Sequence, residues 1–141
     1  MRTKQCVVVA GLGLLAALTA APAVAHHAFN AEFDAKRPVK FKGTVTKMVW
    51  VNPHAWIYVD VKKADGSVEE WMVEAGTPNT LLRRGLTRQS LPAGTEITVD
   101  GYQSKDGSLR ANGRDLTLPN GQTLFIGSSG TGAPSDEKIK K

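Results

Sequence analysis

The feature of this sequence that most constrains its fold is the alternation of apolar and polar residues between Val39 and Val51. In the run VKFKGTVTKMVWV, valine, phenylalanine and glycine alternate with lysine and threonine. A period of two with many β-branched residues predicts a β-strand. Gly43 lies inside this strand and predicts a bulge or a sharp bend, as a small barrel requires where a strand coils.

Two more predicted strands follow. The dipeptide Asn52-Pro53 ends the first run and starts a turn. The run HAWIYVDVKK predicts a second strand over 54–63, and VEEWMVEA predicts a third over 68–75, joined by a hairpin turn at Asp65-Gly66. The residues expected to face the interior are Ala55, Ile57, Val59, Val61, Trp71 and Val73.

A short helix is expected after the third strand. Thr77 can accept a hydrogen bond as the N-cap, and Pro78 suits the first helical position. Leu81-Leu82 would supply the buried side, and Arg83-Arg84 lie where cations favour the helix dipole. Gly85 can end the helix in the left-handed conformation.

The rest of the domain is again β-structure. Strands are predicted over 96–102 (EITVDGY) and 109–118 (LRANGRDLTL), and a short closing strand over 122–126 follows the turn at 119–121. Three strands, one helix and two strands is the order of the OB-fold, a partly open five-stranded Greek-key barrel. The sequence therefore predicts an all-β, OB-like barrel over 39–127 with a short C-terminal hairpin. A β-sandwich is the second choice.

The N-terminus has the three parts of a secretory signal peptide. Arg2 and Lys4 are basic, residues 6–21 are almost wholly apolar, and small residues stand at Ala23 and Ala25. The apolar run is short for a membrane span. We therefore expect a signal peptide over 1–25, cleaved after Ala25, and a soluble periplasmic or secreted protein. An N-terminal arm over 26–38 and a flexible tail over 128–141 would flank the barrel.

Composition excludes several classes of function. The single cysteine, Cys6, would leave with the signal, so the mature chain would have no disulfide, thiolate metal site or cysteine nucleophile. The full chain carries 18 basic and 13 acidic residues, and losing Arg2 and Lys4 reduces its net charge from +5 to +3. With these basic residues scattered, nucleic acid is not an expected partner.

Four segments of the sequence resemble those of a known family. They are HHAFNAEFD, GTVTKMVWVNPHAWIYVDV, GTPNTLLRRG and DGYQSKDGS. Together they resemble a family of small exported bacterial proteins that is catalogued as a domain of unknown function. The resemblance implies an exported single domain and assigns no activity. At the level of fold alone, the chain is distantly similar to periplasmic OB-fold proteins linked to stress tolerance.

The histidines are the strongest candidates for chemistry. Cleavage after Ala25 would make His26 the new N-terminus, followed by His27, and the remaining histidine is His54. An N-terminal amine and ring Nδ1 of one histidine can chelate a metal, and a second imidazole completes a planar set of three nitrogens. Such a set favours Cu(II). We therefore expect copper to bind through His26, His27 and His54, in a binding protein or, as a lower-ranked choice, a brace-type copper oxidase.

Other residues near His54 in the sequence are weaker candidates for metal ligands. The thioether of Met48 could help to hold Cu(I). The alternative is that His54 caps a turn by hydrogen-bonding a backbone carbonyl, and that Met48 and Trp50 are core residues. The partner would then be an unknown small ligand or envelope protein.

A metal-independent function would use the outward aromatic face of the second strand. Trp56 and Tyr58, with Lys40, Lys42 and Thr44 opposite them, resemble the stacking platform of an OB-fold. Outward aromatic residues also often pack under a loop or a partner. No catalytic set is expected, because the glutamates at 69, 70 and 74 are better explained as solvated edge charges.

Overall fold

The computed structural model describes residues 28–127 and Pro134. The expected signal peptide, His26 and His27, and most of the tail lie outside these residues. The elements are, in order, α2 (Ala28–Glu32), β1 (Phe33–Val49), β2 (Trp56–Lys62), β3 (Val68–Glu74), α3 (Pro78–Arg83), β4 (Glu96–Ser104), β5 (Arg110–Thr117) and β6 (Thr123–Phe125). Within residues 28–127, no helix is long and apolar enough to cross a membrane.

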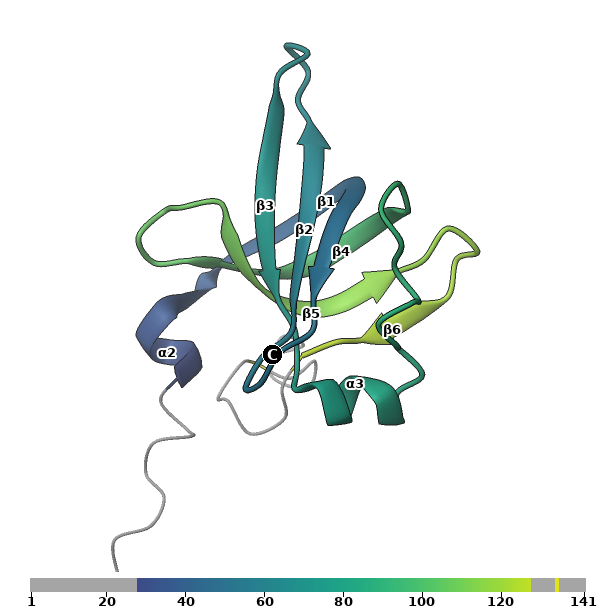
Figure 1. Cartoon of the computed structure of the whole chain (residues 1–141). Helices are drawn as coiled ribbons and strands as arrows, with labels where there is room; N and C mark the ends of the chain where they lie inside the picture. The colour runs from purple at the N-terminus through teal and green to yellow at the C-terminus, as the bar shows by residue number, and fades with distance from the viewer. Residues whose placement is uncertain (1–27, 128–133, 135–141) are drawn as a thin grey trace, which may run out of the picture.

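The strands form a closed ring (Figure 1). β1 pairs with β2 on one side and β4 on the other, β2 pairs with β3, and β4 pairs with β5, all antiparallel. A parallel pairing of β3 with β5 closes the ring, and β6 extends β5 as a hairpin. The predicted all-β barrel, with its helix between the third and fourth strands, is confirmed. One continuous sheet replaces the two layers of the alternative sandwich.

β1 is the long strand that makes this closure possible. Its first part pairs with β4 as far as Thr44, and its second part pairs with β2 from Thr44 onward. A side chain at Gly43 would lie 2.6 Å from the Asp60 carbonyl oxygen, so glycine allows the close approach at the bend. The register shifts just after it, between Val45 and Lys47, as expected for a coiled strand. β1 starts at Phe33, earlier than the predicted Val39.

The interior of the barrel is filled by alternate residues of the strands. Ala55, Ile57, Val59, Trp71 and Val73 are buried as predicted, and Val61 packs against the same core while partly exposed. The observed ends of β2 and β3 differ from the predicted ranges by at most two residues, which is the usual uncertainty of strand ends.

Helix α3 closes one end of the barrel. The backbone N–H of Thr80 donates to Oγ1 of Thr77 over 3.2 Å, which confirms the predicted N-cap. Leu81 is buried, but Leu82 is 48% exposed, so the prediction that both leucines face inward is wrong for Leu82. Adjacent residues of an α-helix point in directions about 100° apart, so Leu82 turns toward solvent when Leu81 faces the barrel. Gly85 ends it with a φ of +86°.

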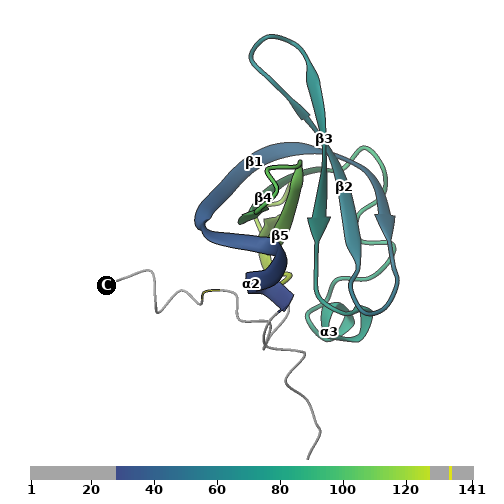
Figure 2. The ribbon, with the colours of Figure 1, turned by 90° about the vertical axis from the view of Figure 1, so that its left-hand side faces the viewer.

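A second, smaller core fixes α2 to the outside of the barrel. Phe29 and Phe33 are both buried, and their ring centroids lie 5.9 Å apart. Tyr102 of β4 meets Phe29 edge-on, at 5.5 Å between ring centroids. Figure 2 shows α2 below β5, where it runs directly into the start of β1. Phe29 and Phe33 therefore anchor the N-terminal segment to the barrel.

Candidate functional site

His54 lies just before β2, at the end of the barrel that α3 closes. Its Nδ1 is 3.2 Å from the carbonyl oxygen of Ala75 and 3.7 Å from Oε1 of Glu74. Because a carbonyl oxygen can only accept, the contact with Ala75 assigns the proton of the neutral ring to Nδ1. The ring lone pair then belongs to Nε2. The expected alternative, a histidine that hydrogen-bonds a backbone carbonyl, agrees with this contact.

Glu74 is a buried carboxylate beside His54. It is 9% exposed, and its Oε1 accepts a hydrogen bond from Nδ2 of Asn112 over 3.2 Å. Burial raises the pKa of the Glu74 carboxyl above its usual range, opposed by the charge of His54 and by the Asn112 hydrogen bond. Perturbed carboxyls of this kind are typical of functional sites. The expectation of a solvated edge charge is therefore wrong for Glu74.

The N-terminal segment brings a second carboxylate, paired with an arginine, into the surroundings of Glu74. Glu32, at the end of α2, pairs with Arg110 of β5 at 2.7 Å, and its charge also acts to raise the pKa of Glu74. The Arg110 guanidinium lies 5.6 Å from the ring of Trp56, which is paired with Glu74 across β2 and β3. Helix α2 is thus held at the end of the barrel where β2 begins and β3 ends (Figures 1 and 2).

The residues of this cluster all lie in the part of the chain that a protein-family model matches. The model of a family of unknown function, DUF6152, matches residues 14–113. The chain belongs to this family. The matched range includes His54, Glu74, Arg110 and Asn112 and ends before β6. No curated protein matches the chain in sequence.

Of the three histidines that could serve this DUF6152 protein as metal ligands, only His54 lies within the described residues. His26 and His27 lie outside them, so the three-histidine set remains a prediction. Within residues 28–127, the structure gathers no group of three histidine, cysteine, aspartate or glutamate side chains that could hold a metal ion. The described part of the chain therefore provides one imidazole for a metal site, and the other ligands of such a site would have to come from outside it.

Met48 and Trp50 pack against the main core of the barrel. Met48 is paired with Ile57, and cross-strand partners point to the same face of a sheet. Met48 therefore faces inward with the buried Ile57, on the opposite face of the sheet from Trp56. The structure gives its thioether a packing role.

The aromatic face of β2 is covered by cations. Nζ of Lys47 lies 4.1 Å from the centroid of the Tyr58 ring, and Arg110 lies beside Trp56. The expectation that Lys40 and Lys42 lie opposite these rings is wrong, because this part of β1 pairs with β4. Lys40 pairs with Asp100 at 3.2 Å, and Lys42 with Glu96 at 2.9 Å.

Sequence reasoning missed Arg110 and Asn112 as members of this cluster. Both belong to the strand predicted over 109–118, but their partners, Glu32 of α2 and Glu74 of β3, lie far away in the chain. A buried asparagine inside a strand requires a hydrogen-bond partner. The sequence can therefore indicate that Asn112 needs a hydrogen-bond partner, but it does not say which residue provides that partner.

Proposed function

We propose that this protein is exported and binds copper at the α2 end of the barrel, with His26, His27 and His54 as its ligands. The observation that carries the proposal is the placement of His54 Nδ1 against Ala75 and Glu74. Metal-binding histidines commonly donate their second ring N–H to a carbonyl or a carboxylate, which fixes the ring and leaves the other nitrogen for the metal. In the described structure, Nδ1 of His54 makes such contacts with the carbonyl oxygen of Ala75 and the carboxylate of Glu74.

The position of α2 supports the remaining two ligands. His27 directly precedes Ala28, the first residue of α2, and α2 is fixed by Phe29 and by the Glu32–Arg110 pair. The chain therefore enters the described domain at the end where His54 lies (Figure 2). A free amine at His26, its own ring and one more imidazole make a nitrogen set that favours Cu(II) over the other divalent ions of the first transition row.

The test begins with the exported protein itself. Cell fractionation with mass measurement of the purified chain should give a protein that starts at His26. Cu(II) affinity is then measured by competition with a chromogenic chelator. We expect His54→Ala, and separately one alanine added before His26, each to weaken binding about tenfold or more. The added alanine removes the amine-and-ring chelate and leaves residues 28–127 unchanged.

Two further variants separate the ligand from its support. Glu74→Gln should weaken copper binding by about tenfold, since it removes the carboxylate next to the imidazole. Trp56→Phe, at the same end of β2, should leave the affinity unchanged. If His54→Ala binds copper as tightly as the wild type, the three histidines do not form one site. A loss of copper binding in Trp56→Phe equal to that in His54→Ala would also contradict the assignment.

A further inference from the structure

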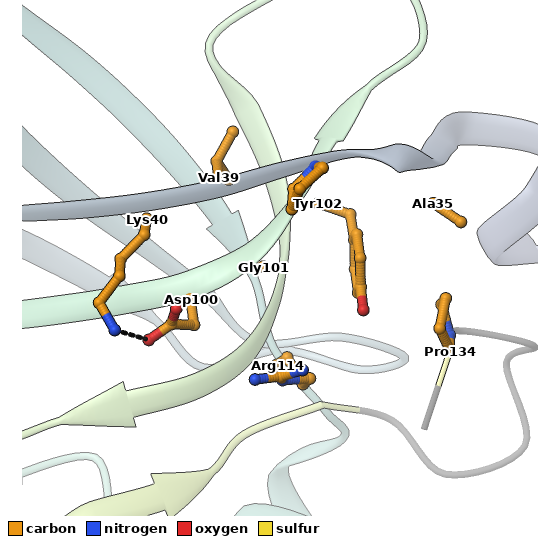
Figure 3. A pocket seen from close by; sticks show the side chains of 9 residues that line it. Ala35, Val39, Lys40, Asp100, Gly101, Tyr102, Arg114 and Pro134 are labelled. Atoms are coloured by element: carbon orange, nitrogen blue, oxygen red, sulfur yellow. Dashed lines mark ion pairs between the residues drawn. The ribbon is translucent and has the colours of Figure 1, made fainter. Parts of the chain in front are cut away.

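A cavity is lined by residues of β1, β4 and β5, and His54 is not among them. It has a volume of about 460 Å³ and opens between β1, β4 and β5 (Figure 3). This volume falls in the range of small-molecule sites, roughly 300–1,000 Å³. One wall is apolar, formed by Ala35, Pro38 and Val39, and Pro134 lies across the opening from them.

Tyr102 supplies the polar group inside this cavity. The side chain is 4% exposed, and its hydroxyl is buried without a hydrogen-bond partner in the described part of the chain. Its ring is fixed by the edge-on contact with Phe29, so the hydroxyl cannot move to find water without disturbing the second core. A buried hydroxyl without a partner is unfavourable, because it has lost its hydrogen bonds to water and gained none in the protein. Figure 3 shows this hydroxyl pointing into the space between Arg114 and Pro134.

The charged residues that line the cavity are two cations, Lys40 and Arg114, and one carboxylate, Asp100, and each cation pairs with an acidic neighbour. Nε of Arg114 donates to Oδ2 of Asp115 over 2.7 Å, which orients the guanidinium at the cavity wall. Nζ of Lys40 lies 3.2 Å from Asp100 at the opposite side. Arginine and lysine can only donate, and the tyrosine hydroxyl can donate as well. The ligand that these groups fit best therefore presents acceptor oxygens.

We propose that this cavity binds a small organic carboxylate. Its carboxylate accepts a hydrogen bond from the Tyr102 hydroxyl near the Arg114 guanidinium, and its apolar body lies against Ala35, Pro38 and Val39. The site is separate from the proposed copper site and does not depend on it, because none of its residues is a proposed copper ligand. It gives the buried hydroxyl of Tyr102 the partner that the described chain does not provide.

The experiment uses the full exported protein and a defined set of probes. Acetate, hexanoate, benzoate and indole-3-acetate are titrated against ¹⁵N-labelled protein, each beside its neutral amide. We expect at least one carboxylate to shift the amide signals of Val39 and Gly101, and to bind more tightly than its amide. Tyr102→Phe should weaken that binding about tenfold or more, because a hydrogen bond to a charged group is lost. Tyr58→Phe, on another face, is the matched control and should bind normally.

Stability of the free protein provides a second readout. Tyr102→Phe keeps the ring that packs on Phe29 and removes only the hydroxyl. Its urea midpoint without ligand should equal or exceed that of the wild type, because an unpaired buried hydroxyl is removed. A lower midpoint would show that the hydroxyl has a partner in the protein and would overturn the proposal. So would the absence of shifts at Val39 and Gly101 with all four carboxylates, or unchanged affinity in Tyr102→Phe.

Discussion

Asn112 donates a hydrogen bond to Glu74 in the parallel strand pairing that closes the barrel. The donor is Nδ2, the acceptor is Oε1, and the two atoms are 3.2 Å apart. The same two residues are register partners of β3 and β5, and both are buried. The bond therefore links β3 to β5, where the barrel closes, and it holds the carboxylate that lies next to His54.

Replacing Asn112 by alanine should destabilise the protein by about 1–3 kcal/mol, because the buried carboxyl of Glu74 loses its amide donor. Urea unfolding followed by tryptophan fluorescence measures this free energy. Asn79→Ala is the matched control: Asn79 is exposed on α3 and should change the stability by about 0.5 kcal/mol or less. Equal costs for the two variants would mean that the bond to Glu74 contributes nothing.

Asp106 should titrate far below an ordinary aspartate. Hydrogen bonds from the Ser104 hydroxyl and the Ser108 backbone lower the pKa of its carboxyl to about 2, from 3.8. A lowered folded-state pKa stabilises the fold above pH 3.8, and this contribution is lost as the pH falls through about 2. Carbon NMR of the Asp106 carboxyl should give a midpoint near 2 in the folded protein.

The matched variant for this prediction is Asp106→Asn. Its stability should be lower than that of the wild type above pH 3.8, and the difference should shrink on acidification toward pH 2. A midpoint near 3.8 in the wild type would contradict the proposed role of Ser104 and Ser108 in holding the ionised form.

The barrel could be predicted from the sequence because its strands follow local rules. Inward residues such as Ile57 and Val73 alternate with polar ones, and turn residues mark the strand ends. The cap of α3 at Thr77 is equally local, since donor and acceptor are three residues apart. In each of these elements the pattern that specifies the structure lies within one short stretch of chain.

The cluster at Glu74 could not be predicted in the same way. Its surroundings depend on residues far away in the chain: Asn112 donates to its carboxylate, and Arg110, which pairs with Glu32 of α2, acts on its charge. On the sequence alone, Glu74 is an outward position of a strand, where a charge is normally solvated. Contacts between residues so far apart in the chain arise only in the tertiary structure, and the alternation of apolar and polar residues carries no information about them.

Gly43→Ala should test how closely β1 crosses β2. The added carbon would lie 2.6 Å from both the Asp60 carbonyl oxygen and Cγ1 of Val59, so the backbone must move. Overpacking of this kind costs about 1–3 kcal/mol, measurable by urea unfolding. The neighbouring Lys42→Ala removes only an exposed ion pair with Glu96 and should cost about 0.5 kcal/mol or less. A tolerated alanine at Gly43 would show that the bend is looser than described.

Alanine substitution of each of the two adjacent arginines at the end of α3 should change the stability of β6 to very different extents. The Arg84 side chain donates from Nη1 to the carbonyl oxygens of Gly127, over 2.5 Å, and Phe125, over 3.3 Å. Its guanidinium also lies 4.5 Å from the centroid of the Phe125 ring. Arg84→Ala should therefore cost about 1–2 kcal/mol and loosen β6.

Amide hydrogen exchange can locate this loosening, because the backbone N–H of Gly76 donates to Ile126 over 2.7 Å. The Gly76 amide should exchange faster in Arg84→Ala, since the chain around Ile126 loses its tie to α3. Arg83 is exposed, and its Nη2 donates to Oγ1 of Thr80, on its own helix, over 3.5 Å. Arg83→Ala should therefore leave the exchange of Gly76 unchanged. Equal exchange in the two variants would mean that any cation near the end of α3 suffices, as a helix-dipole effect alone would require.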